Sequence, residues 1–152
     1  MKYIKLLLLV LIPGILAFSS CSKKSAPQPT VTASMSFKLN GTSKNAATVF
    51  ATYYSTVDAL QVIGQVTDSE GIELQIDSIK VGTFNATAQG IIMGYSPDAA
   101  FQDIFFATSG SVTISTYNNT TVAGTFSFTG VNSLNVAATI SAGTFSAQII
   151  KD

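Results

Sequence analysis

From Ser34 onward, apolar residues recur at every second position, and this alternation is the feature that most constrains the fold. The clearest stretch is Gly71 to Asp77 (GIELQID), in which three apolar residues alternate with three polar ones. Successive side chains of a β-strand point to opposite faces, so this spacing gives each strand one buried and one solvated face. Thr, Val, Ile, Phe and Tyr dominate the same region, as is typical of strands. The pattern predicts strands, and no helix, beyond residue 33.

Turn signals separate these segments at intervals of roughly 8–12 residues, the spacing found in sandwiches and barrels. Asn40-Gly41, Thr67 to Gly71 and Asn118-Asn119 have the composition of hairpin turns, and Ser109-Gly110 is predicted to separate two further strands. We therefore predict an all-β domain over residues 34–152. It is an antiparallel meander of about nine or ten strands that forms a sandwich or a flattened barrel.

Missing residue types limit the chemistry open to this chain. Its 152 residues include no His and no Arg, only 11% are charged, and eight Lys balance eight acidic residues. Without His there is no Ser-His-Asp triad, no Cys-His dyad and no imidazole metal ligand. Without Arg there is no bidentate phosphate clamp, and a net charge of zero argues against nucleic acid. We expect a protein that is not an enzyme, uses no cofactor or metal and binds no nucleic acid.

The carboxylates are the remaining candidates for catalysis or metal binding. A glycosidase needs two carboxyl groups some 5–10 Å apart, and an EF-hand needs more oxygen ligands at fixed spacing. Asp68 and Glu70 fall in a predicted turn, whereas Glu73 and Asp77 fall on a predicted solvated strand face. Carboxylates at such positions ordinarily keep a protein soluble. We assign no catalytic or calcium-binding residue among them.

The N-terminus has the composition of a secretory signal peptide. Lys2 and Lys5 lead into an apolar run from Leu6 to Phe18, which is 13 residues long. That length falls short of the roughly 20 residues that cross a bilayer, and a basic, then apolar, then small-residue order is typical of a cleaved signal. We predict that residues 1–20 are removed. The remaining chain then has six Lys against eight acidic residues, a net charge of −2.

The chain's only Cys directly follows this segment. Phe18-Ser19-Ser20-Cys21 resembles the lipobox of bacterial lipoproteins, in which the Cys thiol is acylated and the signal is cut just before it. The resemblance implies that Cys21 is the lipid-attachment site and that a bilayer is a partner, since several acyl chains give stable attachment. A free thiol without a disulfide partner is the alternative. Residues 21–33, rich in Pro and polar residues, are predicted to be a flexible tether.

The motifs of the body also resemble a known group of proteins. Phe37 to Thr42 spans a strand, an Asn-Gly turn and the next strand, and the closing motifs are GSVTI (Gly110 to Ile114), GTFSF (Gly124 to Phe128) and GTF (Gly143 to Phe145). They are similar to those of small Bacteroidota lipoproteins of unknown function that join a lipobox to an all-β domain. The resemblance implies a fold and a cell-envelope location, and it implies no activity. The Gly-Thr-Phe triplets, which also include Gly82 to Phe84, are interpreted as bulges followed by core Phe residues.

Several functions remain open at this stage. The preferred hypothesis is a non-catalytic binding or accessory lipoprotein, lipid-anchored to the outer membrane and facing the periplasm. The location is implied by the resemblance to Bacteroidota lipoproteins, in which surface export is associated with acidic residues directly after the Cys, and Ser22-Lys23-Lys24-Ser25 has none. Its partner would be a protein or a glycan, for which Tyr53, Tyr54 and Tyr95 offer a contact surface. The alternative is a lipocalin-like carrier of a small apolar ligand, which requires a continuous cavity above about 300 Å³. A pilin completed by a donated strand is a further candidate.

One modification site is also a candidate. Asp77-Ser78-Ile79 resembles the Asp-Ser/Thr-apolar acceptor of Bacteroidota O-glycosylation, which makes Ser78 a candidate glycosylation site.

Overall fold

The computed structural model describes residues 31–98 and 103–152. Cys21, the predicted signal peptide and most of the predicted tether lie outside the described residues. In the described part every regular element is a strand, which confirms the all-β prediction. The strands are β1 (Ser34–Leu39), β2 (Thr42–Asn45), β3 (Thr48–Tyr54), β4 (Ala59–Gln65), β5 (Gly71–Asp77), β6 (Gly82–Asn85), β7 (Ile91–Ser96), β8 (Phe105–Tyr117), β9 (Thr121–Val131) and β10 (Ala137–Lys151).

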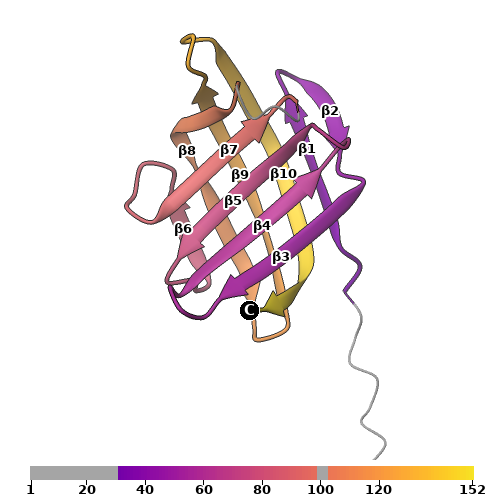
Figure 1. Cartoon of the computed structure of the whole chain (residues 1–152), viewed down its shortest axis with the longest axis vertical. Helices are drawn as coiled ribbons and strands as arrows, with labels where there is room; N and C mark the ends of the chain where they lie inside the picture. Colours follow the sequence, from indigo (N-terminus) through magenta and orange to yellow (C-terminus); the bar gives the residue numbers. More distant parts are fainter. Residues whose placement is uncertain (1–30, 99–102) are drawn as a thin grey trace, which may run out of the picture.

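The strands form two layers that cross at an angle (Figure 1). A front layer contains β3, β4, β5 and β7, and a back layer contains β1, β8, β9 and β10. β2 extends the back layer beyond β1, and β6 pairs with β8. Neighbouring strands are antiparallel at every pairing but one.

The exception is a short parallel pairing that closes the sheet on itself. Ile149 to Lys151 at the end of β10 pair with Ala51 to Tyr53 of β3. β10 also pairs with β9, and the path then continues through β8, β7, β5 and β4 back to β3. The sheet is therefore a flattened barrel closed by hydrogen bonds, which decides between the two architectures that the sequence left open.

The long strands β8 and β10 bend, and each of them pairs with a strand of the front layer as well as with β9 of the back layer. The register of β10 shifts between Ile140 and Gly143, where Ala142 has a φ of 49°. β8 continues through Ser109-Gly110, so the predicted strand break there is wrong. Gly110 adopts a φ of 116° beside a register shift, which makes it a bend within one strand. Local sequence cannot distinguish a turn between two strands from a bend within one strand, since glycine is the preferred residue at both.

The interior is filled by side chains from both layers. Leu60, Leu74 and Ile76 of the front layer are fully buried, and they belong to one cluster with Phe126 and Phe145 of the back layer. The ring centroids of Phe126 and Phe145 lie 6.3 Å apart, and Phe37 lies 6.3 Å from both Phe126 and Tyr95. The predicted alternation in Gly71–Asp77 is confirmed, because Ile72, Leu74 and Ile76 are its buried residues.

The barrel has two distinct ends. The C-terminal end holds the C-terminus, the β3–β4 turn and the β8–β9 turn, and β1 also begins there, with Ser34 opposite Ser146 (Figure 1). The hairpin end, opposite to it, holds the Asn40-Gly41 turn, the β4–β5 turn and the β9–β10 turn. Among the described residues there is no helix with the length and apolar character needed to cross a membrane.

Candidate binding pocket

A row of side chains crosses the outer face of the front layer. Phe50 of β3 lies opposite Ile63 of β4, which lies opposite Glu73 of β5, which lies opposite Gly94 of β7. Gly94 in turn pairs with Phe106 of β8. Phe50 is 47% exposed and Phe106 is 53% exposed, so the row has an aromatic ring at each end. Between the rings, Gly94 contributes no side chain and leaves a gap.

This gap is part of a pocket of about 150 Å³ at the hairpin end. A side chain placed at Gly94 would extend into it, because an added Cβ would lie 3.4 Å from Cγ2 of Ile104 with no closer neighbour. Gly71 differs, since a Cβ there would lie 2.8 Å from the carbonyl oxygen of Gly64. The pocket is lined by Ile63, Gln65, Thr67, Asp68, Ser69, Glu70, Gly71, Ile72, Glu73, Gly94, Ser96 and Ile104.

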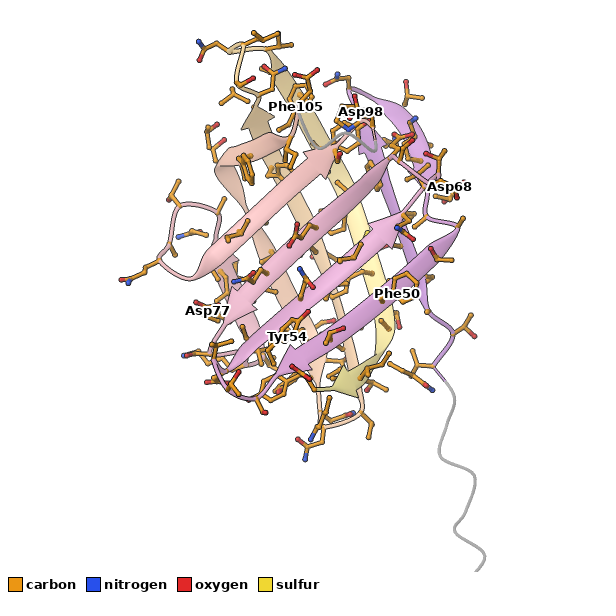
Figure 2. The ribbon with its side chains drawn as sticks, viewed as in Figure 1. Phe50, Tyr54, Asp68, Asp77, Asp98 and Phe105 are labelled. Atoms are coloured by element: carbon orange, nitrogen blue, oxygen red, sulfur yellow. The ribbon has the colours of Figure 1, made fainter. Side chains whose placement is uncertain are left out.

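The β4–β5 turn forms the upper rim of the pocket and has a fixed shape. Thr67 Oγ1 accepts hydrogen bonds from the backbone N–H groups of Ser69 and Glu70, at 3.3 and 2.9 Å. The backbone N–H of Val66 donates to the carbonyl of Glu70 at 2.8 Å. Asp68 therefore projects from an ordered turn at the right of the view, while Asp77 lies near the opposite end of β5 (Figure 2).

Glu70 is the most constrained carboxylate of the pocket. Lys44 Nζ lies 2.9 Å from Glu70 Oε1 and donates to Oε2 at 3.1 Å, and the Tyr95 hydroxyl donates to Oε1 at 2.9 Å. The Tyr95 side chain is 4% exposed and stands under the pocket. Burial and then the hydrogen bond to Glu70 raise the pKa of Tyr95 well above its ordinary value. Lys44 and Tyr95 thus hold the Glu70 carboxylate in place and compensate its charge.

The other two carboxylates of the pocket have no basic partner. Glu73 Oε1 accepts a hydrogen bond from Gln61 Nε2 at 2.7 Å, which orients the carboxylate without neutralising it. Within residues 31–98 and 103–152, the pair of Lys44 with Glu70 is the one salt bridge. Asp68 and Glu73 therefore leave the pocket with two uncompensated negative charges beside the apolar side chains of Ile63 and Ile104.

A second hollow, of about 360 Å³ and wide open, lies on the outer face of the back layer. Thr113, Thr125 and Thr144 line it and stand in register across three strands. The row continues at both sides, where Thr83 bonds Thr113 at 2.9 Å and Ser36 bonds Thr144 at 3.0 Å between hydroxyl oxygens. The lining has no ionisable side chain, so this hollow has no charge with which to select a ligand.

The structure places the candidates from the sequence in different regions. Cys21 lies outside the described residues, and its role as the lipid-attachment site stays a prediction. Ser78 is exposed after β5, with a φ of 52° and its backbone N–H donating to the Asp58 carbonyl at 2.7 Å. Its hydroxyl is accessible, and its glycosylation stays a prediction. In the described part of the chain, no three His, Cys, Asp or Glu residues are grouped to hold a metal ion.

The predicted tyrosine contact surface is wrong for Tyr95, and for Tyr53 and Tyr54 it stays a prediction. Tyr95 is buried among the rings of Phe37 and Phe105, because its position on β7 faces the core. Tyr53 and Tyr54 are half-buried at the C-terminal end, where the Tyr53 hydroxyl donates to Asp58 at 2.8 Å. Sequence reasoning also missed the pocket. The one local signal in the sequence is Gly94, a glycine inside what the structure shows to be strand β7.

Comparison with known proteins identifies a family. The model of a domain of unknown function (DUF6252) matches residues 31–147. No curated protein and no solved structure matches the chain. The match covers all of β1 to β9 and most of β10, and therefore the whole pocket.

Proposed function

Since the chain belongs to the DUF6252 family, whose function is unknown, we propose a function from its residues and geometry. The protein is a lipid-anchored extracytoplasmic lipoprotein that acts as a non-catalytic binding module. Its anchor is Cys21, and its binding site is the pocket at the hairpin end. Because no acidic residue follows Cys21 directly, the protein belongs at the periplasmic face of the outer membrane.

The position of the pocket relative to the start of β1 is the observation that supports this proposal. β1 begins at the C-terminal end of the barrel, so the chain from Cys21 enters the domain there. The pocket lies at the hairpin end, beside the β4–β5 turn. The 15 residues of β10 run between the two ends and have a contour length of about 50 Å at roughly 3.3 Å per residue. An anchored molecule would therefore hold its attached end near the membrane and its pocket away from it.

The carrier hypothesis has less support. A carrier needs an enclosed apolar cavity, whereas this barrel is filled by one buried cluster, in which the ring of Phe37 on the back layer contacts that of Tyr95 on the front layer. Both pockets described above are lined largely by residues of the outer faces. A donated strand has no support either, since β3 and β10 close the sheet by pairing with each other.

The anchor is tested by intact mass of the protein purified from its native host. We expect the mature chain to begin at Cys21 and to carry the mass of acyl chains, and Cys21→Ser to lack that mass. Ser22→Ala is the matched control, which changes the neighbouring small residue and should leave processing and acylation intact. A wild-type chain without acyl mass at Cys21 contradicts the anchor, whatever the pocket binds.

A further inference from the structure

We propose that the pocket at the hairpin end binds a basic side chain, that of a lysine or an arginine, on a partner polypeptide. This inference rests on the proposed function only in taking the pocket as a binding site, and it does not depend on acylation of Cys21. The pocket, its two carboxylates without a basic partner and the exposed rings of Phe50 and Phe106 at the ends of the row carry the argument.

The small size of the pocket favours a single side chain as its ligand. Pockets that enclose a drug-sized ligand occupy roughly 300–1,000 Å³. At about 150 Å³ this pocket is smaller. A ligand that fits must be slender, as is one extended side chain whose parent molecule remains outside.

The charge of the pocket selects a cation. Lys44 compensates Glu70, whereas Asp68 and Glu73 have no basic partner in the described residues. Gln61 fixes the Glu73 carboxylate through one hydrogen bond of 2.7 Å. A carboxylate that is already oriented loses less entropy when it meets an ammonium or guanidinium group. The same two charges disfavour an anionic ligand.

The apolar walls of the pocket favour a ligand whose charged group is carried by an aliphatic chain. Ile63 and Ile104 supply apolar surface, and the absent side chain of Gly94 leaves the space between them. Lysine and arginine bury their methylene stems along apolar surface while the charged group stays hydrated. Phe50 and Phe106 flank the row on both sides and are exposed, so a larger partner has apolar surface on which to rest.

The molecule already contains one contact of this kind. The ammonium group of Lys44 lies 2.9 Å and 3.1 Å from the two oxygens of Glu70, at the edge of the same pocket. The proposed ligand repeats this chemistry at Glu73 and Asp68.

The test is a titration of the full-length mature protein in nonionic detergent, followed by the amide resonances of Gly71 and Gly94. The probe is n-butylammonium, which is the lysine side chain without its backbone, and the neutral control is n-butanol. For a probe this small we expect dissociation constants on the order of 1–10 mM, with n-butylammonium the tighter by about fivefold or more.

Two variants and one control locate the binding. Glu73→Gln should weaken n-butylammonium about fivefold and leave n-butanol unchanged, since it removes only a charge. Gly94→Ala should weaken both probes by about fourfold, because its methyl takes the place of one methylene of the ligand. The added Cβ would lie 3.4 Å from Cγ2 of Ile104, an ordinary contact distance, so we expect this variant to fold. Asp77→Asn, at the far end of the same strand, should change neither affinity.

The outcomes separate the parts of the proposal. Equal binding of n-butylammonium and n-butanol overturns the choice of a cation and leaves a binding pocket. Binding of neither probe overturns the inference, while the anchor at Cys21 stands or falls by its own mass measurement. The peptide acetyl-Gly-Lys-Gly-amide should bind at least as tightly as n-butylammonium. If the peptide does not bind and the free amine does, the ligand is a small amine and the polypeptide partner is wrong.

Discussion

At the scale of single residues, the glycines of the front layer differ in what they do. Gly71 is required by close packing, since its Cβ would meet the carbonyl oxygen of Gly64. Gly94 has room for a Cβ, and its missing side chain leaves space in the pocket instead. Sequence alone cannot distinguish these two glycines, because the distinction depends on Ile104, which follows in a different part of the chain.

Tyr95 is the residue through which the pocket and the core are joined. Its ring packs beside Phe37 and Phe105 in the core, and its hydroxyl donates to Glu70 at the pocket. Hydrogen bonds to charged groups contribute about 1.5–3 kcal/mol. We predict that Tyr95→Phe lowers the free energy of unfolding by about 1.5 kcal/mol in urea at pH 7. Tyr54→Phe, which loses a 3.2 Å bond to Gln61 on a half-exposed side chain, should cost under about 0.5 kcal/mol.

The same residue gives the stability a definite pH dependence. Burial and the hydrogen bond to Glu70 raise the pKa of folded Tyr95, whereas in the unfolded chain it ionises near pH 10. The folded state therefore binds the Tyr95 proton more tightly than the unfolded state does. The resulting contribution to the free energy of unfolding is complete below about pH 10 and is lost as the pH rises further. Between pH 9 and pH 11 the unfolding free energy should fall less steeply in Tyr95→Phe than in the wild type. Identical slopes would contradict the assignment.

At the scale of elements, the alternating pattern predicts strands and their buried faces because both depend on neighbours along the chain. Gly71–Asp77 is a strand with the expected inward residues, and Asn40-Gly41 and the β4–β5 turn lie where turn chemistry puts them. The prediction fails at Ser109-Gly110, where β8 runs on. A strand continues through such a glycine, with a bend, when a neighbouring strand pairs with the residues on both sides of it. β9 pairs with β8 on both sides of Ser109-Gly110, so β8 bends there and does not end.

Gly110 tests this explanation of β8. Its φ of 116° is a conformation that residues with side chains rarely adopt, and a Cβ there would collide with the backbone of Ser127 and Phe128. We predict that Gly110→Ala lowers the unfolding free energy by about 3 kcal/mol or more, measured by urea denaturation. Gly41→Ala is the control, since Gly41 also has a positive φ but has open space around it, and it should cost about 1 kcal/mol. Equal losses would mean that Gly110 is an ordinary turn glycine.

At the scale of the whole molecule, closure of the barrel was beyond prediction from sequence. The parallel pairing joins Ala51–Tyr53 to Ile149–Lys151, which lie at opposite ends of the domain sequence, and no local signal specifies it. The Lys44–Glu70 ion pair was also beyond prediction, because β2 and the β4–β5 turn are far apart in the sequence. The pocket itself lies mainly on the neighbouring elements β4, β5 and β7, and the sequence does not specify how their side chains meet across the strands. The sequence therefore predicted strands and one anchor, but neither the closure nor the site.

Closure also gives the molecule two ends with different roles in our account. The chain from Cys21 enters at the C-terminal end, and the pocket lies at the hairpin end. Val57, in the β3–β4 turn, and Leu134, in the β9–β10 turn, mark these two ends and are both strongly exposed aliphatic residues. The chain has one Cys, and acylation would block it, so a Cys introduced at either position can be labelled alone.

The most direct test of the account is energy transfer from a fluorophore at each marker to acceptor lipids, with the lipidated protein in vesicles. Val57→Cys and Leu134→Cys are labelled separately, and each is compared with the same protein in vesicles without acceptor. We predict clearly stronger transfer from position 57 than from position 134, since the two ends are separated by most of the length of β10. Equal or stronger transfer from position 134, or no transfer from either position in the folded protein, would contradict an anchored end opposite a binding end.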